Sequence, residues 1–175
     1  LVCNAGGPPP GDFLDFDDEA WRAAFELNLE SAIRLCRAVI PDMKARGWGR
    51  IITITSMSVK QPIPGLILSN VMRAGVNGLT KTLADELAPH GITVNNVLPG
   101  MILTQRITSL AERRAAAEGI PVEDALERMA QEIPMKRIGT PEEFANVVVF
   151  LASERASYVT GTAIQVDGGR IRSAW

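Results

Sequence analysis

The chain has 175 residues, 46% of them hydrophobic, and its 18 basic and 20 acidic residues give a net charge of −2. This length suits a single domain with a buried core, and the balanced charge gives no reason to expect a nucleic acid or an anionic membrane as partner. No apolar run approaches the roughly 20 residues that cross a bilayer, and the first residues do not form a secretory leader. We therefore expect a cytoplasmic protein in which Cys3 and Cys36 are reduced core thiols.

The first part of the chain predicts a strand, a long helix and a second strand. Leu1–Cys3 is apolar, and residues 17–46 show the hydrophobic period of a helix. The residues at this spacing, expected to form one buried stripe, are Trp21, Phe25, Leu29 and Ile33. Pro41 lies inside the span and predicts a kink or a break. The next strand covers residues 50–55.

The rest of the chain continues this alternation. A second helix ends at Pro89 and Gly91, and its inner face carries Val76, Leu79, Leu83 and Leu87. Residues 92–98 predict a strand, and the charged, alanine-rich residues 104–132 predict helix with one break at 119–121. Thr140 has the pattern of a helix N-cap, and 163–166 is the last strand. The order favours one α/β domain with a parallel sheet and helices on both faces.

Motifs with polar residues or glycine follow three of the predicted strands. Asn4-Ala5-Gly6 follows the first strand, Ser56 the second and Pro99-Gly100 the third. Each motif alone is also compatible with a simple turn at the end of a strand. Ligands bind parallel sheets beyond the carboxyl ends of the strands, so we expect the three motifs to share one site.

Five motifs in this order carry a family resemblance: Asn4-Ala5-Gly6, Asn28 between two leucines, Ser56, residues 99–104 and residues 166–169. Together they resemble the short-chain dehydrogenase/reductase family, and within it 3-oxoacyl-carrier-protein reductases and bacterial sugar or alcohol dehydrogenases. The resemblance implies the C-terminal portion of a doubly wound parallel Rossmann sheet in a homodimer or homotetramer. It also implies an oxidoreductase that uses NAD or NADP on a small-molecule carbonyl or alcohol.

The resemblance also implies roles for individual residues. Its cofactor contacts fall on Asn4, Ala5, Gly6, Arg73, Pro99, Gly100, Ile102 and Thr104. Its catalytic positions fall on Asn28, Ser56, Ser69 and Arg73. Asn28 would order a water relay, and Ser56 would hydrogen-bond the substrate oxygen. No metal site is expected, and residues 104–132 would form a substrate lid whose apolar side chains weakly favour a partly apolar substrate.

Two of the catalytic positions depart from the family pattern. Ser69 lies thirteen residues after Ser56, where the family has its tyrosine acid, and Arg73 takes the place of the lysine. Residues 59–80 contain no tyrosine, so a shift in register does not restore one. Arginine keeps the positive charge, but an aliphatic hydroxyl is a much weaker acid than a phenol. Losing a positioned acid typically costs about 10²–10⁴-fold in rate.

Other groups remain as sources of the proton. Lys60 lies four residues after Ser56, although a solvated loop lysine is the simpler interpretation. A water held by Asn28 and the two serines is a second source, and an acidic group on the substrate is a third. Tyr158, the single tyrosine, is expected to bury its ring, and the single histidine, His90, is expected in an exposed turn.

These 175 residues contain no Gly-x-Gly-x-x-Gly phosphate loop. The family carries roughly three strand–helix units before the position of Asn4, so we expect the chain to correspond to the C-terminal two-thirds of a domain. Three hypotheses remain. We favour an atypical oxidoreductase; the alternatives are a nucleotide-binding protein that has lost turnover, and a structural protein or fragment. The sequence does not distinguish NAD from NADP.

Overall fold

The computed structural model describes residues 1–173 and contains a four-stranded parallel sheet in the order β1–β2–β3–β4. The strands are β1 (Val2–Asn4), β2 (Gly49–Ile54), β3 (Ile92–Pro99) and β4 (Ala163–Val166). Consecutive strands are neighbours, and a helix-containing segment separates each pair along the chain. The predicted α/β class and parallel sheet are confirmed.

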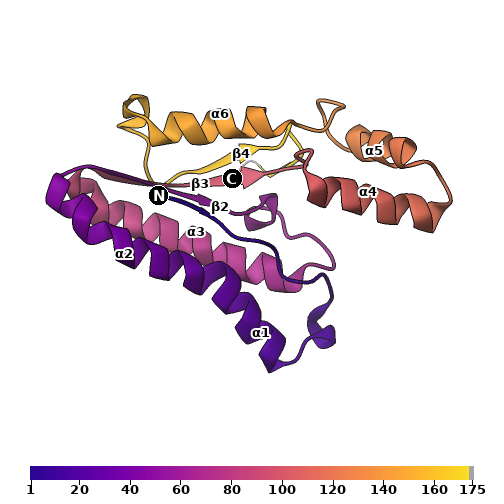
Figure 1. The fold of residues 1–175 in the computed structure, drawn as a ribbon, viewed down its shortest axis with the longest axis horizontal. Helices are drawn as coiled ribbons and strands as arrows, with labels where there is room; N and C mark the ends of the chain where they lie inside the picture. Colours follow the sequence, from indigo (N-terminus) through magenta and orange to yellow (C-terminus); the bar gives the residue numbers. More distant parts are fainter. Residues whose placement is uncertain (174–175) are drawn as a thin grey trace.

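Helices cover both faces of this sheet. The α-helices are α1 (Asp18–Phe25), α2 (Ser31–Arg46), α3 (Ile67–Leu87), α4 (Gln105–Glu118), α5 (Val122–Gln131) and α6 (Pro141–Ala152). A π-helical turn, η2 (Glu26–Glu30), connects α1 to α2. Single 3₁₀ turns are η1 (Phe13–Asp15), η3 (Met57–Val59), η4 (Ala88–His90) and η5 (Glu154–Ala156). Figure 1 shows α2 and α3 on one face of the sheet and α6 on the other.

The alternation of side chains along β2 divides the core between the two faces. Ile51 packs with Cys36 and Leu87 under α2 and α3, whereas Ile52 packs with Leu151 under α6. Successive residues of a strand point to opposite faces, and each fully buried isoleucine stabilises the fold by about 1.5–3 kcal/mol. Cys3 and Cys36 are both buried and free, as expected.

The local signals at the helix ends are confirmed. The Thr140 hydroxyl accepts a hydrogen bond from the Glu143 amide, and the Glu143 carboxylate accepts one from the Thr140 amide. This reciprocal cap starts α6. After η4, which follows the end of α3, Gly91 takes a left-handed conformation with φ 71°, which favours glycine. His90 lies in the exposed turn predicted for it.

The predicted buried stripe of the first long helix is wrong by about one position. Phe25 is 39% exposed, and the buried residues of α1, η2 and α2 include Ala24, Asn28, Ala32 and Cys36. The small side chains in this set allow the helix to lie close to the sheet. The larger ones lie to the side, where Leu29 packs against Gly75 of α3 so closely that a β-carbon there would be 2.9 Å from the leucine.

Two other helix predictions are corrected in the same way. Helix α2 continues through Pro41 to Arg46, so of the predicted kink or break at Pro41 the break is wrong. Pro41 is exposed, which places its ring on the solvent side of the helix. In α3, Val76 and Leu87 are buried as predicted, but the other two leucines of the proposed inner face are only partly buried. Thr80 and Ala84 occupy the buried face instead.

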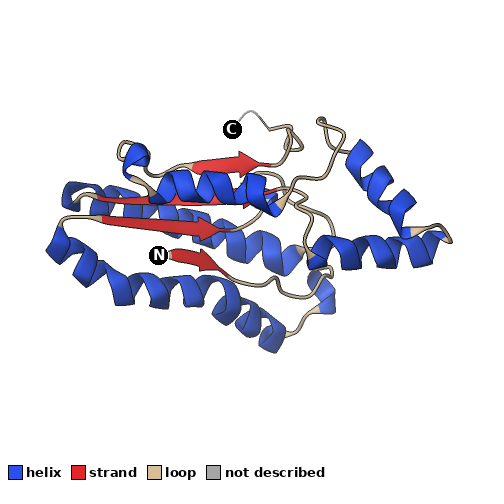
Figure 2. Ribbon diagram, turned by 45° about the horizontal axis from the view of Figure 1, so that its top comes forward, coloured by secondary structure: helices blue, strands red, loops and turns tan. Residues whose placement is uncertain are grey.

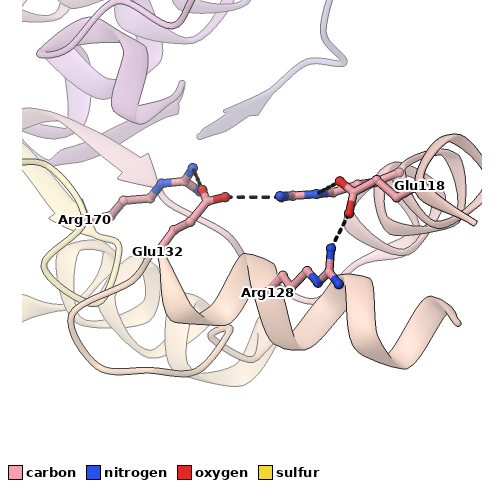
Figure 3. Close-up of polar contacts among 5 residues, drawn as sticks. Glu118, Arg128, Glu132 and Arg170 are labelled. Atoms are coloured by element: carbon pink, nitrogen blue, oxygen red, sulfur yellow. Dashed lines mark hydrogen bonds and ion pairs between the residues drawn. The ribbon is translucent and has the colours of Figure 1, made fainter. Parts of the chain in front are cut away.

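Helices α4 and α5 extend beyond the carboxyl ends of the strands (Figure 2). They pack on each other through a small core of Ala111, Ala115, Ala125 and Met129, and they separate at Gly119, as predicted. Charged side chains add exposed contacts around this pair, and Figure 3 shows Glu132 between an arginine of α4 and Arg170. Within the described residues, no helix combines the length and the apolar character needed to span a membrane.

Candidate active site

The parallel strands bring the three sequence motifs to the same edge of the sheet. Asn4 is the last residue of β1 and pairs with Ile54, and Ser56 follows β2 by two residues. Pro99 is the last residue of β3. Because all strands run in the same direction, their carboxyl ends form one rim, and the chain segments after them lie together.

Asn28 reaches this rim from the π-helical turn η2. Its side-chain amide donates a hydrogen bond to the Gly6 carbonyl at 2.7 Å, and the residue is only 4% exposed. The side-chain oxygen is buried and has no hydrogen-bond partner among the described residues. Single π-turns inside helices often occur at functional sites, and a buried acceptor without a partner is an energetic cost that a ligand or water removes.

Ser69 and Arg73 lie one turn apart near the start of α3 and are buried, at 8% and 9% exposure. The guanidinium donates from Nε to the Ser69 hydroxyl at 3.1 Å and from Nη1 to the Thr55 carbonyl at 2.8 Å. Weaker bonds of 3.4 Å reach the carbonyls of Ile54 and Gly6. Arg73 therefore connects α3 with the ends of β1 and β2.

The positive charge of Arg73 has no carboxylate among the partners described for it. Its hydrogen bonds all go to backbone carbonyls or a hydroxyl. Burial lowers the pKa of the Arg73 guanidinium, and the nearby positive charge of Arg106 lowers that pKa further. Arginine has so high an intrinsic pKa that it remains charged at neutral pH. The site therefore contains a buried cation that only dipoles stabilise.

The hydroxyl proton of Ser56, at the same rim, has no acceptor among residues 1–173. The Ser56 oxygen accepts a hydrogen bond from the Ser58 amide at 3.1 Å and caps η3. This bond uses a lone pair and leaves the O–H group able to donate to a ligand. Lys60 extends elsewhere: its ammonium group donates to the side-chain oxygen of Gln165 at 3.4 Å. Lys60 thus has an interaction on β4 rather than with Ser56.

The segment after β3 supplies backbone groups. The Gly100 amide donates to the Val166 carbonyl at 3.0 Å, and a β-carbon on Gly100 would lie 2.6 Å from Asp167 Cα. Ile102 pairs with Gly139 through bonds made by the residues on either side of Ile102. The amide and carbonyl of Ile102 take no part in those two bonds. Thr104 is the N-cap of α4, and its side chain makes no capping bond.

A cavity of about 210 Å³ lies between β1, β2 and the helices η2, α2 and α3. Its polar lining includes Asn4, Asn28, Thr55 and Arg73. Beneath it, the Thr55 hydroxyl donates to the side chain of Asn96 at 2.8 Å, and the Asn96 amide donates to Asn77 at 3.1 Å. This buried chain of hydrogen bonds fixes the end of β2, from which Arg73 takes its carbonyl partners.

The structure places two residues where the sequence did not lead us to expect them. Tyr158 is fully exposed, so the expectation that its ring is buried is wrong; the 3₁₀ turn η5 directs this segment to the surface before β4. Arg106 was not singled out from the sequence, although it contacts Gly7 beside the Asn4-Ala5-Gly6 motif. Its position two residues after Thr104 is the only sequence signal that marked it.

Comparison with known proteins identifies the family of the chain. The family model described as Enoyl-(Acyl carrier protein) reductase matches residues 1–170. The chain is 38% identical over 169 residues to nodulation protein G of Azospirillum brasilense, covering 97% of this chain and 64% of that protein. It belongs to the short-chain dehydrogenase/reductase family.

Solved structures of this family show the same fold. L-sorbose reductase from Gluconobacter frateurii, complexed with NADPH and L-sorbose, is 39% identical with a TM-score of 0.94. An NADPH-bound short-chain oxidoreductase from Pseudomonas aeruginosa, described as containing an atypical catalytic centre, is 34% identical with a TM-score of 0.86. Each match covers 99% of this chain and 66% of the solved chain. The chain spans about three fifths of the curated relatives it matches and corresponds to the C-terminal portion of the family fold.

Proposed function

We propose that the protein containing this chain is an atypical NAD- or NADP-dependent oxidoreductase that interconverts a carbonyl and an alcohol. The observation that carries this proposal is the position of Arg73, which holds Ser69 at the same rim as Asn28 and Ser56. The relatives support it, because one of them is a reductase solved with NADPH and its sugar substrate.

The residues present fit the nicotinamide half of such a cofactor. A β-carbon on Gly6 would meet nothing within 4 Å, so the backbone there is open to close approach by a ligand. Arg73 has five N–H groups, of which four make the bonds described. The remaining Nη2 hydrogen suits a ribose hydroxyl. The amide and carbonyl of Ile102 have no hydrogen-bond partner in the part of the chain that the structure describes. Together with the hydroxyl of Thr104 they suit a carboxamide.

The mechanism follows from the two serines and the arginine. The bound cofactor supplies the hydride. Ser56 donates a hydrogen bond to the substrate oxygen, and Ser69, whose lone pair is occupied by Arg73, directs its own proton to the same oxygen. The buried charge of Arg73 stabilises the negative charge that develops there, because a preorganised charge away from water acts strongly. The proton that completes the alcohol would come from a water held by the unpartnered oxygen of Asn28, and solvent would reprotonate that water.

A second copy of the chain would cover the exposed apolar side chains of η2, α2 and α3. Leu27, Leu35 and Val71 are each more than two-fifths exposed. Exposed apolar groups on neighbouring helices favour a protein interface. We therefore infer a homodimer through these helices, or a homotetramer that contains this dimer.

A nucleotide-binding protein without turnover is the second candidate. The absence of a phenolic acid at Ser69 favours it, because a serine hydroxyl gives up its proton far less readily than a tyrosine. Both candidates share the cofactor, so binding alone does not separate them.

The test uses the N-terminally complete protein. Calorimetric titration with NADH and NADPH identifies the cofactor, and a screen of carbonyl substrates follows cofactor oxidation by absorbance. Micromolar binding with turnover supports the oxidoreductase. Binding without turnover on any substrate supports the second candidate, and a folded protein that binds neither nucleotide contradicts both.

A further inference from the structure

Arg106 and Arg73 place two guanidinium groups at one pair of glycines. Arg73 donates from Nη2 to the Gly6 carbonyl. Arg106, from the first turn of α4, lies so close to Gly7 that a β-carbon there would be 2.7 Å from Nη1 and 3.2 Å from Cζ. Gly7 therefore has to lack a side chain for Arg106 to reach this position. The two guanidinium groups therefore lie at consecutive residues of the loop after β1, with Arg73 buried and Arg106 exposed.

Neither cation is neutralised by the residues that the structure describes. Arg73 bonds only to carbonyls and a hydroxyl, and Arg106 is in none of the ion pairs found between residues 1 and 173. The positive charge of Arg106 is one cause of the lowered pKa of Arg73. Two positive charges that repel each other with no anion between them are energetically unfavourable.

The start of α4 adds to this positive field. No acidic residue lies in the first turn of α4, and the Thr104 side chain makes no capping bond. The Ile107 amide bonds to the Thr104 carbonyl, which leaves the amides of Gln105 and Arg106 without a partner among the described residues. The start of a helix favours anions because its free N–H groups point outward. By contrast, α6 begins with Glu142 and Glu143 and has a complete cap. The three features together indicate a ligand with negative charge.

We propose that Arg73 and Arg106 form an oxyanion-binding site that takes a carboxylate or phosphate group at the reaction centre. Arg106, whose guanidinium makes none of the hydrogen bonds described, can match two oxygens of either anion with its planar N–H groups. Arg73 adds its buried positive charge. This proposal rests on the proposed function, since the anion belongs either to the substrate, as in an oxo acid or hydroxy acid, or to a phosphate of the cofactor. In either case the ligand would lie between helix α4 and the loop after β1.

Binding of inorganic phosphate tests the site without requiring turnover. Calorimetry on the N-terminally complete protein compares the parent with Arg106→Gln and with Arg113→Gln, a matched change of an exposed arginine further along α4. Arg106→Gln should weaken phosphate binding by about tenfold or more, equivalent to roughly 1.4 kcal/mol, and Arg113→Gln should leave it unchanged. Gly7→Val should act like Arg106→Gln, because its side chain would displace the guanidinium.

Two further comparisons identify the source of the anion. If the substrate provides it, Arg106→Gln raises KM for a 2-oxo acid but not for the methyl ester of that acid. If the cofactor provides it, Arg106→Gln weakens NADPH binding in the absence of substrate. Parent protein that does not bind phosphate, or equal binding by Arg106→Gln, overturns the proposal. If Arg106→Gln abolishes phosphate binding but changes neither KM for the 2-oxo acid nor NADPH binding, the phosphate is an adventitious ion only. That result also overturns the proposal. If the complete protein shows no turnover but still binds phosphate through Arg106, the proposed oxidoreductase activity is contradicted and the proposed anion site is supported.

Discussion

Arginines in two regions of the molecule are stabilised in opposite ways. In the helix pair α4 and α5, which we propose as a substrate lid, Arg114 bonds to Glu118 and Glu132 in exposed ion pairs at 2.8 and 3.2 Å (Figure 3). At the reaction centre, Arg73 is buried and bonds only to neutral groups. Exposed ion pairs contribute little to the stability of the fold, because water screens them. A buried charge is costly unless its polar partners stabilise it. The lid therefore tolerates changes in charge that the reaction centre does not.

The largest expected effect comes from placing a phenolic acid at the proposed reaction centre. The double change Ser69→Tyr with Arg73→Lys should raise turnover by about 10²–10⁴-fold, because a tyrosine next to a cation is a far better proton donor. Initial rates on a substrate that the parent accepts provide the measurement. Ser69→Tyr alone is the control. Turnover that does not increase would show that the acid is not the missing element.

Removal of the buried cation tests how much of the fold depends on it. Arg73→Met should lower the free energy of unfolding by about 3 kcal/mol, because it leaves the Thr55 carbonyl and the Ser69 hydroxyl without the donor that Arg73 provides. Urea unfolding of the complete protein measures this, with Arg113→Met as the exposed control. An effect no larger than that of the control would contradict the structural role of Arg73.

In the same region, Ser56 is expected to affect the rate of catalysis with little effect on the stability of the fold. Ser56→Ala should lower turnover by about 100-fold, the typical cost of one donor to a developing oxyanion, with little change in unfolding. Ser58→Ala is a matched control, because the Ser58 hydroxyl is buried without a hydrogen-bond partner among the described residues. Equal rates for the two variants would place the chemistry elsewhere.

In the lid, Glu132 is the acidic residue that joins α4 to the segment after β4. Glu132→Gln should weaken the contacts with Arg114 and Arg170 and increase hydrogen exchange in α4 and α5, with a much smaller effect on unfolding than Arg73→Met. Exchange followed by mass spectrometry measures the difference. Unchanged exchange would mean that the apolar core of the two helices alone holds the lid.

The smallest expected effect is a pH dependence at the start of α6. The Arg137 side chain, together with the Thr140 amide, holds the pKa of Glu143 at about 2, below its ordinary 4.5. A carboxylate whose pKa is lower in the folded state stabilises the protein fully above its unfolded pKa. The difference in stability between the parent and Glu143→Gln should therefore shrink as the pH falls from about 4.5 to about 2. A constant difference in acid unfolding would contradict this.

Local chemistry determined which features could be predicted from the sequence. The cap at Thr140 and the strand at 163–166 depend on neighbouring residues, and both were predicted at the correct positions. The rim that brings together Asn4, Ser56 and Pro99 follows from the parallel order of the strands. The exposure of Phe25 and Tyr158 depends on how whole helices and turns pack, which the period of hydrophobic residues does not determine.

Arg106 shows why part of the candidate site could not be predicted. Nothing in the first turn of α4 distinguishes a solvated arginine from one that reaches another segment. Its contact with Gly7 requires the lid and the loop after β1 to be adjacent, and the two residues lie about a hundred positions apart in the chain. Long-range contacts of this kind become visible only in the folded arrangement.

The hydrogen bonds of Arg73 also have a consequence for the order of folding. They join residues separated by 18 and by 67 positions in the sequence, and contacts over long separations form slowly because the intervening chain must first be ordered. The reaction centre is therefore expected to assemble late, after β1, β2 and α3 have docked. A spectroscopic probe at this site would report completion of the parallel sheet rather than formation of its individual helices.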